Sequence, residues 1–365
     1  MPRAFGTTVS QKLGDSLSRN FAVIQGRYLQ DILNQPQAIR ATWQSLHQSE
    51  ALDKIRGLLA SRKFERIVLT GMGSSYFGLH PLALEIAEHG WTPVLLETSE
   101  LVHYYPHLLS GATLVIAVSQ SGKSAETLRL LKHNGDQQVV IAVTNTVDSP
   151  LAEQADVSIL THAGEEFSVS CKTYVAAHVA LSALSAVLCG LDVEKRLHDL
   201  EPAAGAVEGY LHDWEQHVSG FCDAMQEIRH LFFIGRGPSL AAVGTGALII
   251  KESDHFHAEG MSCAAFRHGP FEMLTPETYV GVFAGDERTR SLNERLAADI
   301  QGNGTQSALI GSDVSQAACR IPTVAPVVRP IVEILPVQMV TLALAALGNR
   351  EPGKFERATK VTVVE

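Results

Sequence analysis

The sequence predicts an α/β protein with two units, each a parallel sheet flanked by helices in three αβα layers. Short β-branched runs alternate with helical stretches, which is typical of βαβ units. The 365 residues are too many for one ordinary core. Gly71-Met72-Gly73 and Gly235-Arg236-Gly237, 164 positions apart (235 minus 71), each follow an apolar run and open a helix. This similarity indicates an internal repeat.

The first series of elements begins after an N-terminal arm, residues 1–25. Apolar spacing predicts two amphipathic helices between Gly26 and about Arg62, and Asn34-Gln35-Pro36 is expected to end the first one. Further helices are predicted at residues 76–89 and from Ser124. The strands of this series are predicted at residues 66–70, 93–97, 114–118, 139–144 and 157–160.

A long helical region at residues 174–225 separates this series from a second one. Strands are predicted there at residues 231–234, 279–284 and 307–310, with helices at about 241–257, 293–303 and 331–347. After the arm, we therefore expect one domain over residues 26–205 and a second domain over residues 206–365.

Composition excludes several classes of protein. The net charge of −10 argues against a nucleic-acid partner. Five scattered cysteines form no CxxC pair, which favours a reducing compartment over a disulfide framework or a zinc knuckle. The N-terminus lacks the apolar core of a signal peptide. The most apolar run, residues 175–191, contains His178 and is interpreted as a buried helix and not a membrane span. We expect a cytoplasmic protein.

Hydroxyl groups are concentrated at the predicted carboxyl ends of two neighbouring strands. Ser119-Gln120-Ser121-Gly122-Lys123-Ser124 follows one strand, and Ser74 and Ser75 follow the other. Ligands of open α/β sheets bind at such ends, and helix N-termini attract anions. The serines could simply cap helices, but their number favours a phosphate monoester. The aligned segment Ala284-Gly285-Asp286-Glu287 carries carboxylates, so we expect one phosphate site per chain.

A second candidate cluster, residues 251–259 (KESDHFHAE), comes late in an otherwise apolar helix. Burial could raise the pKa of Glu252 toward that of a general base, although an ion-paired helix carboxylate is an equal alternative. His268 lies in a Gly-Pro turn and could shuttle protons, whereas His257 is interpreted as structural. Metal binding by His255, His257, Glu259 and His268 is disfavoured. His255 and His257 are two positions apart, and side chains at that spacing on a helix point in different directions. We expect no metal and no cofactor.

These residues together resemble the sugar isomerase (SIS) domain family, whose domains have a flavodoxin-like fold. The likeness extends over residues 27–365 to the tandem-domain isomerase part of glutamine–fructose-6-phosphate aminotransferases (glucosamine-6-phosphate synthases). Its motifs are Gln35-Pro36, Gly73-Ser74-Ser75-Tyr76, Ser119-Gln120-Ser121-Gly122, Ala163-Gly164-Glu165-Glu166, Lys251-Glu252, His257-Ala258-Glu259, His268-Gly269-Pro270 and Ala358-Thr359-Lys360-Val361-Thr362.

The resemblance implies a role for each matching residue. Glu252 would move a proton between C1 and C2, His268 would open the sugar ring from a neighbouring subunit, and Lys360 would engage the ketose carbonyl. A homodimer is implied by the shared histidine. The phosphate contacts would be Ser74, Ser75, Ser119, Gln120, Ser121 and Ser124, and the sugar contacts Gly73, Val169 and Ser170.

Three departures from the family pattern shape the expected activity. The chain shows no glutaminase part with an N-terminal nucleophilic cysteine. Ile249 replaces a lysine of the synthases, and Lys123 replaces an acidic residue. We therefore expect a glutamine-independent enzyme, an isomerase or deaminase of an amino-sugar or ketose 6-phosphate. A fructosamine-phosphate deglycase, a pure isomerase and a non-catalytic sugar-phosphate sensor remain the alternatives.

Overall fold

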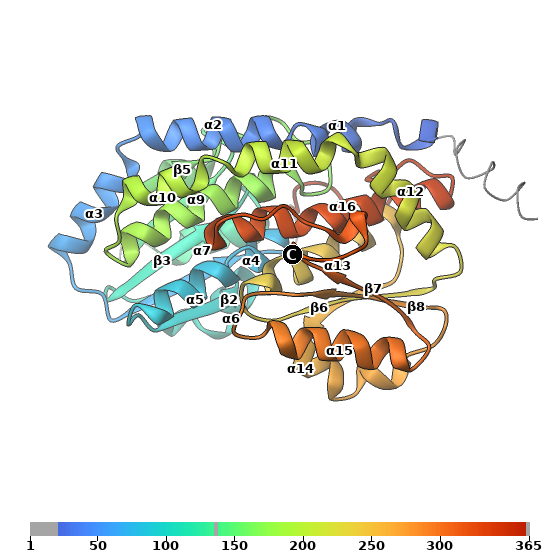
Figure 1. Ribbon diagram of the computed structural model, residues 1–365. Helices are drawn as coiled ribbons and strands as arrows, with labels where there is room; N and C mark the ends of the chain where they lie inside the picture. The colour runs from blue at the N-terminus through green and yellow to red at the C-terminus, as the bar shows by residue number, and fades with distance from the viewer. Residues whose placement is uncertain (1–20, 135–137, 363–365) are drawn as a thin grey trace, which may run out of the picture.

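The computed structural model describes residues 21–134 and 138–362. Two fully parallel sheets lie side by side, with helices on both faces of each (Figure 1). The first sheet has the order β2-β1-β3-β4-β5 and the second the order β7-β6-β8-β9. The strands are β1 Arg66–Gly71, β2 Pro93–Glu97, β3 Thr113–Val118, β4 Val139–Thr144, β5 Val157–Leu160, β6 His230–Gly235, β7 Ala258–Ser262, β8 Thr278–Phe283 and β9 Gln306–Ile310.

The helices fall in the predicted helical regions and also, as short helices such as α6, α8 and α14, outside them. In the first part they are η2 Phe21–Ile24, α1 Arg27–Leu33, α2 Gln35–Gln48, α3 Ala51–Ser61, α4 Ser74–Phe77, α5 His80–Glu88, α6 Thr98–Tyr104, η3 Pro106–Leu108, α7 Ala125–Asn134, α8 Pro150–Gln154 and α9 Lys172–Leu188. In the second part they are α10 Val193–Leu200, α11 Ala203–His212, α12 Trp214–Met225, η4 Gly237–Ser239, α13 Leu240–Asp254, α14 Cys263–Arg267, η5 Pro270–Met273, α15 Arg290–Gly302, η6 Ala317–Cys319, η7 Pro326–Val328 and α16 Arg329–Leu347.

The two sheets confirm the predicted α/β fold and repeat the same strand order. β1 and β6 start 164 positions apart (230 minus 66), and β3 and β8 start 165 apart (278 minus 113). In each sheet the strand that opens the unit lies between the second and third strands of that unit. The same topology at a nearly constant offset supports the internal repeat.

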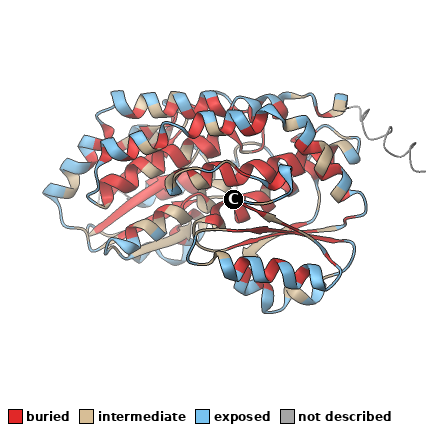
Figure 2. Cartoon of the chain, in the orientation of Figure 1, coloured by how far each residue is buried: buried red, intermediate tan, exposed pale blue. Residues whose placement is uncertain are grey.

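One continuous core connects the two sheets. Alternate residues of a strand point to opposite faces. The inner-facing residues of both sheets join a single cluster with α2, α9, α13 and α16. The outer faces form separate clusters, one under α6, α7 and α8 and the other under α14 and α15. Figure 2 shows the buried residues concentrated along these inner layers.

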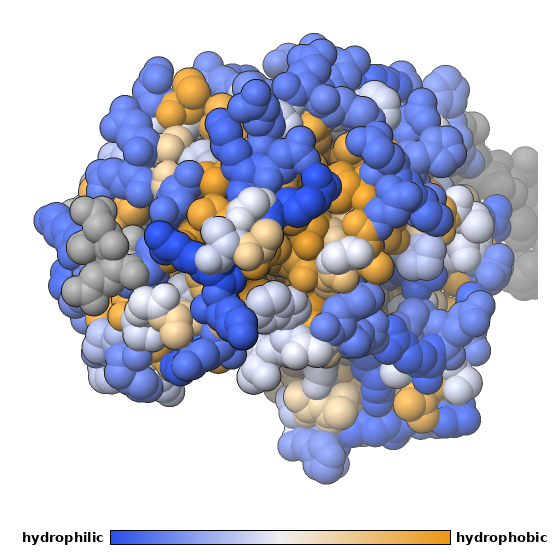
Figure 3. All heavy atoms as spheres, turned by 90° about the vertical axis from the view of Figure 1, so that its left-hand side faces the viewer, coloured by the Kyte–Doolittle hydropathy of each residue, from blue (hydrophilic) through white to orange (hydrophobic). Residues whose placement is uncertain are grey.

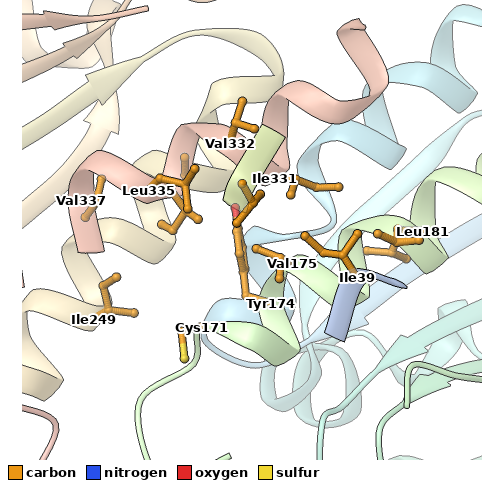
Figure 4. Packing of buried hydrophobic residues seen from close by; sticks show 14 of the residues in the cluster. Ile39, Cys171, Tyr174, Val175, Leu181, Ile249, Ile331, Val332, Leu335 and Val337 are labelled. Carbon is orange, nitrogen blue, oxygen red and sulfur yellow. The ribbon is translucent and has the colours of Figure 1, made fainter. Parts of the chain in front are cut away.

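Helix α16 is the central element of this shared core. Its residues Ile331, Val332 and Leu335 lie beside Tyr174 and Val175 of α9 in Figure 4. The segment 326–347 is long and apolar enough to cross a membrane, but 89% of its most apolar window is buried inside the structure. This burial is typical of a core helix. On the face drawn in Figure 3, apolar side chains are visible in the middle, surrounded by hydrophilic ones.

Several predicted boundaries were wrong for local reasons. The N-terminal region contains three helices where two were expected, because Ser49 and Glu50 interrupt the periodic stretch before α3. Asn34 does separate α1 from α2. The region 174–225 divides into four helices, α9 to α12. Of the N-terminal arm, residues 21–24 form the helix η2 and residues 1–20 lie outside the described residues.

The helix that carries Glu252 ends earlier than predicted, and a strand follows it. His255 takes a left-handed conformation with φ of 52° and caps α13 through its backbone N–H to the Lys251 carbonyl. Arg350 donates to the Asp254 carbonyl at 2.5 Å and fixes this end. The next residues form β7, which pairs with β6. His257 and Glu259 are therefore not on the helix of Glu252, contrary to the prediction.

Candidate active site

A cavity of about 350 Å³ lies at the carboxyl ends of β1 and β3. Its walls come from the loops after these strands, the end of α13, the segment before α9 and the C-terminal tail. The predicted residues that line it are Gly73, Ser74, Ser75, Ser119, Gln120, Ser121, Ser124, Ser170, Glu252 and Lys360. The structure thus brings together residues that are almost 290 positions apart in the sequence (360 minus 73).

In the loop after β3, backbone N–H groups donate hydrogen bonds to the hydroxyl oxygens of two serines. Ser119 Oγ accepts from the Gly122 N–H at 3.2 Å, and Ser121 Oγ accepts from the Lys123 N–H at 3.4 Å. A hydroxyl that accepts from an N–H keeps its own proton for another acceptor. Capping and ligand binding are therefore compatible here, and the O–H groups of these two serines are free to be donated to phosphate oxygens.

Gly122 is required by the shape of this loop. Its φ is 63°, which strains most other residues, and an added Cβ would lie 2.2 Å from Ser149 Oγ. Ser124 precedes α7 and accepts weakly from the Thr127 N–H at 3.4 Å. The helix N-terminus behind the loop adds a positive dipole end. The tail reaches this point too, because the Thr362 carbonyl accepts from the Ala125 N–H at 3.0 Å.

Lys360 is held by a buried carboxylate that the sequence analysis did not assign. Its Nζ lies 2.7 Å from Oε2 of Glu166, whose side chain is 0% exposed, and 2.8 Å from the Ser168 carbonyl. The other donors to Glu166 are the N–H groups of Cys171 and Thr173, both at 2.9 Å, Thr173 Oγ1 at 2.7 Å and the Cys171 thiol at 3.5 Å. This network anchors the tail to the segment before α9.

The surroundings of Glu252 raise its pKa, as is expected for a general base. Burial raises the pKa of Glu252 to about 7, and the negative Glu166 adds to the rise, whereas Lys360 opposes it. A carboxyl with a pKa near neutrality can both take up and return a proton. Glu252 and Lys360 line the same cavity as the serine loop.

Two predicted site residues lie elsewhere in the chain described here. The Val169 side chain is 1% exposed and packs in the core, because the segment 166–171 turns it inward while Ser168 and Ser170 face the cavity. His268 is exposed at the end of α14 and is absent from the cavity walls. His268 therefore does not line the cavity of its own chain.

Other wall residues were missed by the sequence analysis. Glu126 is 7% exposed, and its Oε2 has no hydrogen-bond partner among the described residues. The remaining missed positions are Met72, Val118, Thr127, Glu166, Ser168, Thr173, Leu248, Phe355, Ala358, Thr359, Val361 and Thr362. The motif Ala163-Gly164-Glu165-Glu166 was the available signal for Glu166, but a sequence does not reveal which of two adjacent glutamates is buried.

The residues considered for a metal do not form a metal site. His257 Nε2 lies 3.6 Å from Glu259 Oε1, and His255 faces Arg350 and Glu356. Over residues 21–134 and 138–362 there is no group of three or more His, Cys, Asp or Glu placed to hold a metal ion.

Residues 58–187 match the family model of the SIS domain. This range contains all five strands of the first sheet, the serine loop and Glu166, so the family match falls on the first α/β unit. The chain is also 31% identical over 352 residues to glutamine–fructose-6-phosphate aminotransferase [isomerizing] of Pyrococcus horikoshii, and the alignment covers 92% of this chain and 57% of that protein. The chain thus spans somewhat more than half the length of the curated relatives it matches.

Solved structures share the fold over nearly the whole chain. The C-terminal domain of glucosamine-fructose-6-phosphate aminotransferase from Francisella tularensis superposes with a TM-score of 0.77 at 20% identity, covering 89% of this chain and 97% of that one. Glucosamine-6-phosphate deaminase from Thermotoga maritima gives a TM-score of 0.75 at 16% identity, covering 93% and 100%. At these identities, the comparison establishes the two-sheet architecture.

Proposed function

We propose that this protein is a glutamine-independent phosphosugar isomerase or deaminase that acts on an amino-sugar or ketose 6-phosphate. One observation carries the proposal: a phosphate-type hydroxyl loop, a carboxyl with a pKa of about 7 and a lysine line one cavity. The aminotransferase and deaminase named above are similar proteins that act on such compounds. Ile249, where the synthases have a lysine, supports chemistry without glutamine.

The proposed reaction assigns one end of the substrate to each part of the cavity. The serine hydroxyls, Gln120 and the dipole of α7 would hold the phosphate. Glu252 would take the C2 proton of an open-chain 2-amino aldose and deliver it to C1, which converts the amine into a C2 imine. Water would add to the imine and ammonia would leave, giving the ketose. Lys360 would stabilise the developing charge on the carbonyl oxygen.

The proposal extends to the second unit and to a partner subunit. We propose that residues 26–205 and 206–365 are two SIS domains, supported by the repeated strand order and offset. We also propose a homodimer in which His268 enters the cavity of the neighbouring chain and opens the sugar ring. The exposure of His268 and its absence from its own cavity support this arrangement.

An assay of the purified protein against a panel of sugar phosphates tests the proposed activity. Glucosamine 6-phosphate and fructosamine 6-phosphates are incubated with the protein while ammonia, free amine and ketose are measured. Ammonia release from glucosamine 6-phosphate supports the deaminase, and amine release from a fructosamine phosphate supports the deglycase alternative. Binding of these compounds without any turnover would contradict the enzyme proposal and favour a sensor.

A further inference from the structure

A second cavity, of about 330 Å³, lies at the carboxyl ends of β6 and β8 in the second sheet. It is bounded by the loops after these strands and by α5, α9 and the start of α16. Its position in the second unit corresponds to that of the candidate active site in the first, because both cavities lie at the ends of equivalent strands. The two cavities are also similar in size.

Equivalent residues line the two cavities. At the offset of 164, Glu252 corresponds to Glu88, and Leu248 corresponds to Leu84. Glu252 and Leu248 line the first cavity, and Glu88 and Leu84 line the second. The local sequences Ala83-Leu84-Glu85-Ile86-Ala87-Glu88 and Ala247-Leu248-Ile249-Ile250-Lys251-Glu252 share four of six residues. A helix therefore brings a leucine and a glutamate to each cavity in the same way.

The groups suited to phosphate have been replaced in the second cavity. Pro238 stands where the first unit has Ser74, and a proline offers neither a hydroxyl nor an N–H. Asp286 stands where the first unit has Ser121, at the offset of 165. Ser239 corresponds to Ser75, but its hydroxyl already donates to Glu333 Oε1 at 2.8 Å. The serine donors of the first cavity are thus missing from the second, and its cation, Arg288, is already paired with Glu88 and Asp286.

The charge of the second cavity favours a cation instead. Arg288 forms ion pairs with both Glu88 and Asp286, so one guanidinium is shared by two carboxylates. Glu85 is balanced separately by Arg196 at 2.5 Å. Three carboxylates, those of Glu85, Glu88 and Asp286, are thus paired with two guanidinium groups, which leaves one net negative charge at the cavity. Arg288 is 71% exposed, so a bound amine could replace its contact with Glu88 at low cost in desolvation.

A buried polar atom in the cavity wall also lacks a partner. His178 is 4% exposed, and its Nε2 has no hydrogen-bond partner among the described residues. Burial lowers the pKa of His178 to about 3, so the ring is neutral at physiological pH. The ring lies beside Gly78, which also lines the cavity. A Cβ added to Gly78 would be 3.8 Å from His178 Nε2. The other walls are largely apolar, including Leu82, Leu181 and Val327.

We infer that this cavity is a second ligand site, which binds an unphosphorylated organic monocation of monosaccharide size. The ammonium would lie between Glu88 and Asp286, and the body of the ligand would contact the apolar wall formed by α5, α9 and α16. The inference concerns binding at a site distinct from the proposed catalytic one, and it holds whichever reaction the first cavity performs.

Calorimetric titration with two matched pairs of compounds tests this site. Glucosamine is compared with glucose, and cyclohexylamine with cyclohexanol, so that each pair differs in the charged nitrogen. We expect at least one amine to bind about tenfold more tightly than its neutral counterpart. Asp286→Asn and Glu88→Gln should each weaken that amine about tenfold, while Glu277→Gln, an exposed carboxylate outside the cavity, should not change it.

Two further measurements separate this site from the first cavity and from a subunit contact. The double variant Ser75→Ala/Ser121→Ala should retain amine binding, because these serines line the first cavity only. Loss of amine binding in that variant, or its retention in Asp286→Asn, would overturn the inference. So would the absence of binding by either amine, or sedimentation showing that Asp286→Asn dissociates an oligomer without affecting the amine. Circular dichroism checks that each variant is folded.

Discussion

The ammonium of Lys360 lies 2.7 Å from a carboxylate oxygen of Glu166, whose side chain is completely buried. This contact joins the C-terminal tail to the segment before α9 across 194 positions of sequence. It completes the cavity wall and places the lysine charge near Glu252, where it opposes the effect of burial on the pKa of that carboxyl.

Glu166→Gln should loosen the tail and lower turnover. The glutamine keeps the size of the side chain but removes the charge that holds Lys360, and a buried charged hydrogen bond is worth about 1.5–3 kcal/mol. We expect at least a tenfold fall in kcat and faster proteolytic cleavage after residue 353. Lys354→Met, which removes an exposed lysine of the same tail, is the matched control and should behave as wild type.

The serine loop should control affinity for the phosphate. Sugar phosphates, but not neutral free sugars, are expected to raise the melting temperature, because a ligand of the native state stabilises it by mass action. Ser75→Ala and Ser121→Ala should each weaken this effect, while Ser315→Ala, at an exposed serine outside the cavity, should not. Equal stabilisation by glucose and glucose 6-phosphate would count against a phosphate site.

The raised pKa of Glu252 predicts a pH dependence of stability. Its pKa is about 7 in the folded chain, against an ordinary value of 4.5, so the folded state binds more protons between these pH values. The free energy of unfolding should therefore fall as the pH rises from about 4.5 to about 7. Buried Glu333, whose pKa is also about 7, acts in the same direction.

Urea unfolding at pH 5 and pH 8 measures this effect. Glu252→Gln should lose less stability between the two pH values than wild type does, because the titrating group is gone. Glu227→Gln, an exposed glutamate on the loop after α12, should keep the wild-type difference. An unchanged difference in Glu252→Gln would show that burial does not raise the pKa of this carboxyl in solution.

The position of His268 predicts that mixed dimers regain activity. If Glu252 and His268 from different chains form each site, Glu252→Gln and His268→Ala are both inactive alone, but a heterodimer of the two has one intact site. Mixing equal amounts under exchange conditions should restore roughly a quarter of wild-type turnover. A protein that sediments as a monomer, or a mixture that stays inactive after proven exchange, argues against a shared site.

The sequence predicted the sheets well because their signals are local. Strands such as β3 and β4 are fully buried runs rich in β-branched residues, and the glycines after β1 and β6 mark the turns into helices. By contrast, β7 has the sequence Ala-Glu-Gly-Met-Ser, which lacks β-branched residues, and it forms because β6 offers a free edge. Its existence depends on tertiary contacts that a local pattern does not contain.

The site residues that belong to sequence motifs were predicted. Those whose position depends on packing were not. The hydroxyl loop, Glu252 and Lys360 were identified from their motifs, and the structure brings them to one cavity. Glu166 and Glu126 were missed because the burial of a carboxylate depends on tertiary packing, which the sequence does not show. Val169 was misplaced because one residue decides which side chain of a bent segment faces the cavity.

We propose that Glu252 moves a proton between adjacent carbons of a sugar phosphate. The direct measurement is solvent-deuterium exchange at C1 or C2 of glucosamine 6-phosphate and fructose 6-phosphate, with wild type and Glu252→Gln side by side. We predict exchange with wild type, and a rate reduced roughly 10²–10⁴-fold in Glu252→Gln, at nearly unchanged affinity for the sugar phosphate. Tight binding by wild type without any carbon-bound exchange would contradict the account, and so would undiminished exchange in Glu252→Gln.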